Sequence, residues 1–234
     1  MRTGVGLVSE VRVDERGEHS AWIRCEESIS PAPGQYVMAR ERRDGEAVSS
    51  TALFASAYDQ DSFLALDPQP AWQPGTRLEL RSPLGRGFNT PAQARRVALV
   101  ALEGQAGRLL PLAQMALEQG AAVVLYCDPV PSGLPVSLEA FPLAALPEGL
   151  AWADFIAADA HLAALSNLGA LLGLQSGVKA SLVGQTLVRT DMPCAGMGEC
   201  GVCALLTRGG WKLVCKDGPV FDLQALDWEH AAEG

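Results

Sequence analysis

Four of the six cysteines in this 234-residue chain lie in its last fifth, and they restrict its fold more than any other feature. They are Cys194, Cys200, Cys203 and Cys215, with the spacing C-x5-C-x2-C-x11-C. Cysteines gathered in this way form a zinc site, a disulfide framework or an iron–sulfur cluster. Each of these uses requires the backbone to bring the four side chains together.

A zinc site fits the spacing poorly, and disulfides fit the expected compartment poorly. Zinc sites with four cysteines usually contain two C-x2-C pairs, and only Cys200 and Cys203 form one here. The N-terminus lacks the regions of a secretory signal, and no apolar run has membrane-spanning length, so we expect a cytoplasmic protein outside the membrane. In that reducing compartment, clustered cysteines are typical of metal or cluster ligands.

A [2Fe–2S] cluster explains more of the segment. The plant-type pattern is C-x4-C-x2-C with a more distant fourth cysteine, and this chain has one additional residue in the first gap. Glycines allow positive φ and a close approach of backbone N–H groups to the sulfur atoms, and three lie here: Gly196, Gly198 and Gly201. Residues 207–213 predict a hairpin that returns Cys215 to the other three cysteines.

The first ninety residues predict a small antiparallel β-barrel. Short runs with partial alternation of apolar and polar residues are separated by glycine and proline, as is typical of strands joined by turns. The predicted strands are Val5–Val13, Trp22–Cys25, Tyr36–Ala39, Thr51–Tyr58, Ser62–Leu66 and Arg77–Leu80. We assign residues 1–92 to this barrel domain.

The pattern then changes to one of alternating strands and helices. Val97–Leu102 and Ala121–Tyr126 are continuous apolar runs, which suit buried parallel strands. Gly107–Glu118 and Ala160–Leu172 have the apolar spacing of helices, and Asp154–Ala158 is a further short strand. We therefore predict an α+β multidomain chain, in which a Rossmann-like parallel α/β domain over residues 93–188 is followed by a cysteine module over 189–234.

The formal net charge of −9 bears on the partners of the chain. Binding to a phosphate backbone needs a basic surface that releases counterions, and docking on anionic lipids needs one as well. We therefore expect neither nucleic acid nor a membrane as a partner.

The order of these parts resembles the electron-transfer subunit of class 1B dihydroorotate dehydrogenase, a ferredoxin-reductase-like family. Three stretches carry the resemblance: Pro33–Met38, Ser82–Phe88 and Cys194–Phe221. The resemblance implies an FAD-binding-type barrel, a nucleotide-binding-type α/β domain, and one [2Fe–2S] cluster on Cys194, Cys200, Cys203 and Cys215. It also implies FAD between the two larger domains, and a hetero-oligomer with a flavin-bearing catalytic subunit that acts in pyrimidine biosynthesis.

The flavin motifs of that family are degenerate in this chain. An Arg-Pro-x-Ser motif, whose arginine contacts the FAD pyrophosphate, corresponds to Leu53-Phe54-Ala55-Ser56, which keeps only the serine. The glycine-rich loop of the α/β domain corresponds to residues 101–111, which keep Gly104 and Gly107 and add the acidic Glu103. Ser56, Gly104 and Gly107 are thus what is left of an FAD site, and whether FAD is bound is left open.

No set of nucleophile and base is visible, so we predict a non-catalytic electron-transfer subunit that carries a [2Fe–2S] cluster. Two alternatives stay open at this point. One is a complete NAD(P)H reductase subunit with both FAD and the cluster, and the other is a non-redox assembly subunit whose cysteines hold a structural metal.

Overall fold

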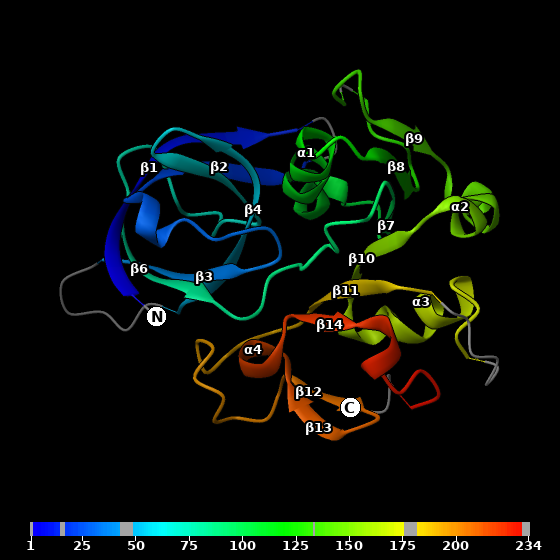
Figure 1. The fold of residues 1–234 in the computed structure, drawn as a ribbon. Helices are drawn as coiled ribbons and strands as arrows, with labels where there is room; N and C mark the ends of the chain where they lie inside the picture. Colours follow the sequence, from blue (N-terminus) through cyan, green and yellow to red (C-terminus); the bar gives the residue numbers. More distant parts are fainter. Residues whose placement is uncertain (1, 15–16, 43–48, 133, 176–181, 231–234) are drawn as a thin grey trace.

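The six predicted N-terminal strands close into one antiparallel barrel in the computed structural model, which describes residues 2–14, 17–42, 49–132, 134–175 and 182–230. The barrel order is β1-β2-β5-β4-β3-β6 (Figure 1). Its strands are β1 (Arg2–Val13), β2 (His19–Arg24), β3 (Tyr36–Glu41), β4 (Thr51–Asp59), β5 (Ser62–Leu66) and β6 (Arg77–Leu84). The predicted barrel is confirmed.

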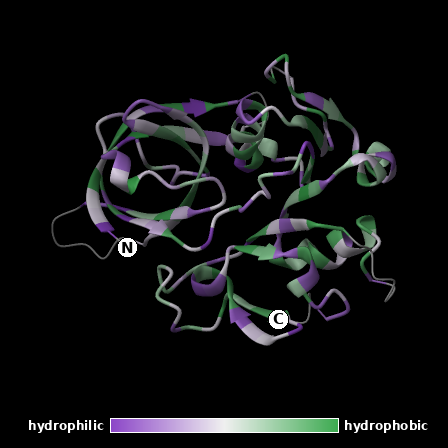
Figure 2. Cartoon of the chain, viewed as in Figure 1, coloured by the Kyte–Doolittle hydropathy of each residue, from purple (hydrophilic) through white to green (hydrophobic). Residues whose placement is uncertain are grey.

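Alternation along the strands explains why the barrel closes. In β5, Phe63 and Ala65 are fully buried, whereas the residues on either side of them are only partly buried. A period of two directs successive side chains to opposite faces, so one face of each strand fills the interior. Hydrophilic and hydrophobic residues accordingly alternate along the barrel ribbons in Figure 2.

A six-stranded sheet follows the barrel, in the order β14-β11-β10-β7-β8-β9. Neighbouring strands are parallel except for β14, which runs antiparallel to β11. The strands are β7 (Arg96–Ala101), β8 (Ala122–Cys127), β9 (Glu139–Phe141), β10 (Phe155–His161), β11 (Gly184–Arg189) and β14 (Val220–Asp222). The predicted parallel α/β arrangement is therefore confirmed.

Short helices connect these strands. The α-helices are α1 (Leu110–Glu118), α2 (Leu146–Trp152), α3 (Leu165–Leu171) and α4 (Val214–Asp217). The 3₁₀ helices are η1 (Glu27–Ile29), η2 (Ala106–Leu109), η3 (Leu143–Ala145), η4 (Leu162–Ala164) and η5 (Leu223–Ala225). The helix predicted over Ala160–Leu172 begins too early, because Ala160 and His161 still belong to β10 and pair with β11. No helix in the described part of the chain is long and apolar enough to cross a membrane.

The cysteine segment contains the predicted hairpin, formed by β12 (Ala204–Thr207) and β13 (Gly210–Leu213). The strand that follows it, β14, joins the α/β sheet through the pairs Gln185↔Asp222 and Leu187↔Val220. We did not predict this return to the sheet. The boundaries at residues 92 and 188 stay a prediction.

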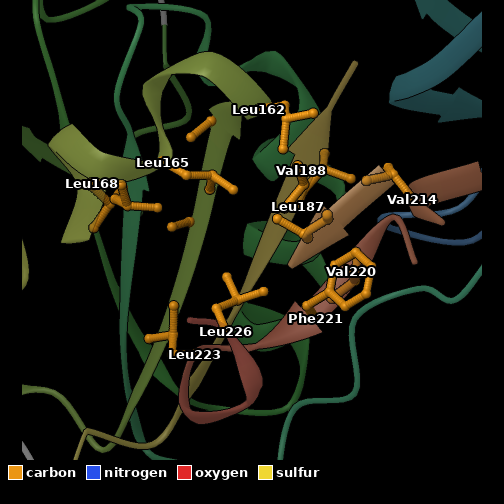
Figure 3. Close-up of a cluster of buried hydrophobic side chains, with 14 of the residues drawn as sticks. Leu162, Leu165, Leu168, Leu187, Val188, Val214, Val220, Phe221, Leu223 and Leu226 are labelled. Atoms are coloured by element: carbon orange, nitrogen blue, oxygen red, sulfur yellow. The ribbon is translucent and has the colours of Figure 1, made fainter. Parts of the chain in front are cut away.

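One apolar core joins the cysteine segment to the rest of the protein. Figure 3 shows Leu165 and Leu168 from α3, Leu187 from β11, and Val214 and Phe221 from the C-terminal segment packed together. The same cluster continues through two of the cysteines to the barrel strands β3 and β4. Because this core is continuous, the cysteine segment is held against both the sheet and the barrel.

Candidate metal centre

The three stretches that carry the family resemblance meet at one place in the structure. A Cβ atom added to Gly34 would lie 2.7 Å from Val220 and 2.8 Å from Phe88. The backbone N–H of Arg86 donates a hydrogen bond of 2.6 Å to the Gly218 carbonyl oxygen. Glycines in the first two stretches are thus needed where the backbones of the barrel and the cysteine segment approach each other closely.

The four predicted ligands lie in two pairs. Cys194 and Cys200 are in the outer loop, where Cys200 is exposed and its thiol is hydrogen-bonded to Cys194. Cys203 and Cys215 are buried, and their thiols are hydrogen-bonded to each other. The two buried positions are tied together by the backbone as well, because the N–H of Val214 donates to the Cys203 carbonyl oxygen at 2.9 Å. The fold therefore brings the predicted ligands together as two pairs.

Cys194 and Cys215, one from each pair, differ strongly in pKa when no metal is bound. The backbone N–H groups of Glu199 and Cys200 and the Cys200 thiol lower the pKa of Cys194 from 9.0 to about 6. Burial, together with the Cys203 thiol, raises the pKa of Cys215 to about 12. The Gly198 N–H points at both sulfur atoms. The outer loop is thus built to hold a thiolate, which is the form that binds metal.

This difference predicts the reactivity of the cluster-free chain. A lowered pKa means that the folded chain favours the Cys194 thiolate, so its contribution to stability is present above pH 9 and is lost as the pH falls through about 6. Alkylation of Cys194 should therefore already be fast at pH 7 and should slow below pH 6, whereas Cys215 should stay unmodified. Peptide mass spectrometry after alkylation at several pH values measures both, and equal labelling of the two cysteines would contradict the assignment.

Two glycines of the loop offer a matched test of how tightly it is packed. Gly196 (φ +71°) and Gly201 (φ +76°) have the same left-handed backbone, but a Cβ atom would lie 2.6 Å from the Tyr36 hydroxyl at Gly196 and in open space at Gly201. Gly201→Ala should cost about 1–2 kcal/mol of folding free energy from backbone strain alone. Gly196→Ala should cost more and should reduce the metal content. Denaturant unfolding and metal analysis compare them, and equal effects would contradict this packing.

The donor set fits an iron–sulfur cluster. Among the described residues, no three His, Cys, Asp or Glu side chains are close enough together to hold a single metal ion. Two thiol pairs suit a centre with two metal atoms, because each metal atom takes two thiolates. They suit a single tetrahedral zinc ion less well, because zinc needs its four donors around one point. The N–H groups that point at Cys194 and Cys215 supply the hydrogen bonds that such a centre requires.

The degenerate flavin site has a different geometry. A Cβ atom added to Gly107 would lie 2.8 Å from Leu66 and 3.4 Å from Cβ of Ser56, so the barrel and the loop of the α/β region touch directly. The Ser56 hydroxyl is buried and donates to the Leu64 carbonyl oxygen at 3.3 Å. Leu53, in place of the family's arginine, is fully buried inside the barrel.

The backbone at position 104 requires a glycine for a structural reason of its own. It adopts φ +78°, and a Cβ atom would lie 2.8 Å from the Asp128 carbonyl oxygen. Beside it lies a cavity of about 420 Å³ whose described charged lining residues are the acidic Asp14 and Glu18. A phosphate at this loop would meet carboxylates instead of the cations that favour it.

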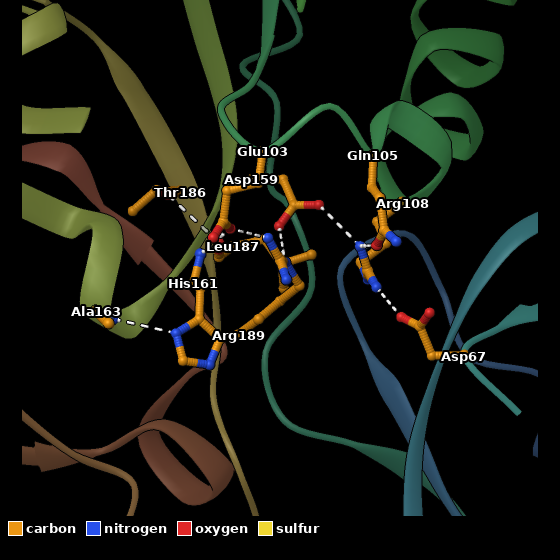
Figure 4. A network of polar contacts seen from close by, with 10 residues as sticks. All are labelled: Asp67, Glu103, Gln105, Arg108, Asp159, His161, Ala163, Thr186, Leu187 and Arg189. Atoms are coloured by element: carbon orange, nitrogen blue, oxygen red, sulfur yellow. Dashed lines mark hydrogen bonds and ion pairs between the residues drawn. The ribbon is translucent and has the colours of Figure 1, made fainter. Parts of the chain in front are cut away.

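A buried ion-pair network joins the two larger parts of the chain at this point (Figure 4). Arg108 pairs with Asp67 from the barrel and, at 3.4 Å, with Asp159 from β10. Asp159 pairs in turn with Arg189 at 2.6 Å, and Arg189 also pairs with Glu103. The side chains of Arg108 and Asp159 are only 3% and 1% exposed, so their charges need these partners.

The network gives three charged residues of this region structural roles. Asp159 lies within β10 and is buried. Arg108 is neither free to meet a phosphate nor on the surface, since it is enclosed by carboxylates and the Phe54 ring. Glu103 turns toward Arg189 and accepts a hydrogen bond from the His161 N–H at 2.8 Å. The residues that remain of the flavin motifs therefore do not fit FAD in this structure.

The comparisons with known proteins agree with the cysteine site. Residues 190–227 match the iron–sulfur cluster binding domain of dihydroorotate dehydrogenase B. The match includes all four cysteines and ends near β14. No curated protein matches the chain in sequence.

Solved structures share the fold of almost the entire chain. The structure of an NADH-dependent reduced ferredoxin-NADP oxidoreductase superposes with a TM-score of 0.73 at 18% identity and covers 97% of this chain and 91% of that one. A ferredoxin reductase of carbazole 1,9a-dioxygenase gives 0.60 at 16% identity, with 74% and 65% covered. An Amycolatopsis cytochrome P450 reductase gives 0.58 at 15% identity, with 80% and 70% covered. At these identities the likeness shows the fold alone.

Together these findings confirm the predicted resemblance. The chain has a ferredoxin-reductase-like fold with an iron–sulfur cluster binding domain of the dihydroorotate dehydrogenase B type at its C-terminal end.

Proposed function

We propose that this chain carries one [2Fe–2S] cluster on Cys194, Cys200, Cys203 and Cys215 and relays single electrons between partners in an oxidoreductase complex. The observation that carries the proposal is the arrangement of the four cysteines in two pairs, one buried and one in an outer loop. A bound cluster supplies a centre that takes up and releases one electron at a time.

The residues of the chain have separate tasks at this centre. The N–H groups of Gly198, Glu199 and Cys200 point at Cys194 and stabilise its negative charge. Cys203 and Cys215 lie in the apolar core, which keeps water from the inner edge of the site. Cys200 is exposed, so the outer edge is the side from which a partner exchanges electrons.

The partner we propose is a flavin-bearing catalytic subunit of the dihydroorotate dehydrogenase type, in a cytoplasmic hetero-oligomer. Support comes from the family match of residues 190–227 and from the exposed apolar side chains of Met197 and Val202 beside Cys200. Enrichment of methionine is typical of interface cores. The reaction and its place in pyrimidine biosynthesis belong to this proposal.

We further propose that the chain itself works without FAD. Support comes from the direct contact of Gly107 with Leu66 and Ser56, and from Arg108 being occupied by two carboxylates. The cluster would then be the last redox centre of this subunit and a relay between partners.

Co-purification tests the proposal. The chain, expressed with a dihydroorotate-oxidising partner, should form a complex in which acid extraction releases flavin only from the partner. Addition of dihydroorotate under anaerobic conditions should reduce the cluster. FAD released from the isolated chain, followed by NADH-dependent reduction of its cluster, would instead favour the complete reductase.

A further inference from the structure

Two side chains of the barrel reach into the cysteine segment. Tyr36 on β3 donates a hydrogen bond of 2.7 Å to the Cys215 carbonyl oxygen. Arg81 on β6 donates to the Ala195 carbonyl oxygen and contacts the Met197 sulfur. Each half of the cysteine site therefore receives one polar contact from the barrel, which lies outside the segment that matches the iron–sulfur domain family.

The contact of Arg81 falls on a strained point of the loop. Ala195 follows Cys194 directly and has φ +52°, in the left-handed region that residues other than glycine rarely adopt. Such a conformation persists where surrounding contacts fix it. The guanidinium of Arg81 supplies a contact of this kind, because it holds the carbonyl group of that residue.

The charge of Arg81 is available to the site. Within the described part of the chain no carboxylate forms an ion pair with it, whereas its neighbour Arg40 pairs with Glu79 at 2.5 Å. Both arginines line a cavity of about 560 Å³ that Ala195 also borders. A reduced cluster carries one more negative charge than an oxidised one, so a nearby unpaired cation stabilises the reduced form.

We propose that Arg81 is a positioning residue for the cluster, which holds the Cys194–Cys200 loop against the barrel and raises the reduction potential of the centre. This inference rests on the proposed function, since it needs a bound cluster. It assigns to the barrel a role at the metal site.

Redox titration of the full chain, followed by electron paramagnetic resonance, tests the proposal. Arg81→Gln should make one-electron reduction about tenfold less favourable, which lowers the midpoint potential by about 59 mV. Arg81→Lys keeps the charge and should recover most of the shift. Arg40→Gln, at the same cavity but with an ion-paired arginine, should leave the potential unchanged. A loaded Arg81→Gln variant with an unaltered potential would overturn the proposal.

A second variant decides the matter if Arg81→Gln fails to hold the cluster. In Arg81→His the charge can be removed by pH, so the midpoint potential should fall as the pH rises through the imidazole pKa, and the unaltered chain should not show this step. The same potential on both sides of that step would overturn the inference. Absence of a cluster from the unaltered chain is a different result, which contradicts the proposed function itself.

Discussion

Replacing Cys203 by serine should abolish the metal centre while the chain remains folded. Cys203 is 1% exposed and its thiol is paired with Cys215, so no other donor can reach its place from solvent. A serine hydroxyl keeps its proton near neutral pH and is a poor substitute for the soft thiolate that iron–sulfur clusters require. The expected result is loss of the visible absorbance, of bound iron and of the reduced-state resonance.

Cys25→Ser provides the matched control. Cys25 is also buried, at 7% exposure, but it lies in the barrel core away from the cysteine segment. Burial raises its pKa to about 11, as expected for a thiol that serves as a small apolar side chain. This variant should lose some stability and keep its full iron content. Retention of the iron and of the resonance in Cys203→Ser would remove Cys203 from the ligand set.

Replacing Arg108 by alanine should cost about 3–5 kcal/mol of folding free energy, because removal of one member of a buried ion pair leaves its partner uncompensated. Asp159 would keep only its ion pair with Arg189. Asp67 of the barrel would lose its ion pair with the α/β part of the chain. Chemical denaturation measures the loss. Because we propose that no flavin is held here, the variant should show no change in flavin content.

Arg96→Ala is the control for this experiment. Arg96 also pairs with an aspartate, Asp154, at 2.6 Å, but its side chain is half exposed. Exposed ion pairs contribute little to stability, so the unfolding midpoint should hardly move. Equal midpoints for Arg108→Ala and Arg96→Ala would contradict the structural role of the network. Loss of bound FAD from the Arg108 variant would support the complete reductase.

The barrel and most of the sheet were predictable because their signals are local. Six short runs bounded by glycine and proline became the six barrel strands, and the apolar runs at Val97 and Ala121 became β7 and β8. Periodicity and turn chemistry act over a few residues, and so they can be recognised without knowledge of the fold.

Long-range features could not be predicted in the same way. β14 has three residues and joins the sheet only because the hairpin of the cysteine segment returns the chain to β11. The network of Arg108, Asp159 and Arg189 depends on partners separated by 30 to 51 positions in the sequence. The sequence signalled this network only through the acidic Glu103 beside Gly104, which we interpreted as part of a degenerate phosphate site.

The cysteine site lies between these two cases. Its residues and their glycines were predictable from spacing, whereas their pairing and the contributions of Tyr36 and Arg81 were not. Those contributions come from strands more than a hundred residues away in the sequence, and nothing at either position marks a contact with a metal site.

The most direct test of this account is metal analysis combined with electron paramagnetic resonance of the protein purified without oxygen. We expect a red-brown protein with about two iron and two sulfide ions per chain, no FAD, and the resonance of a [2Fe–2S] cluster after reduction. A colourless protein that holds one zinc ion per chain and shows no resonance would contradict it.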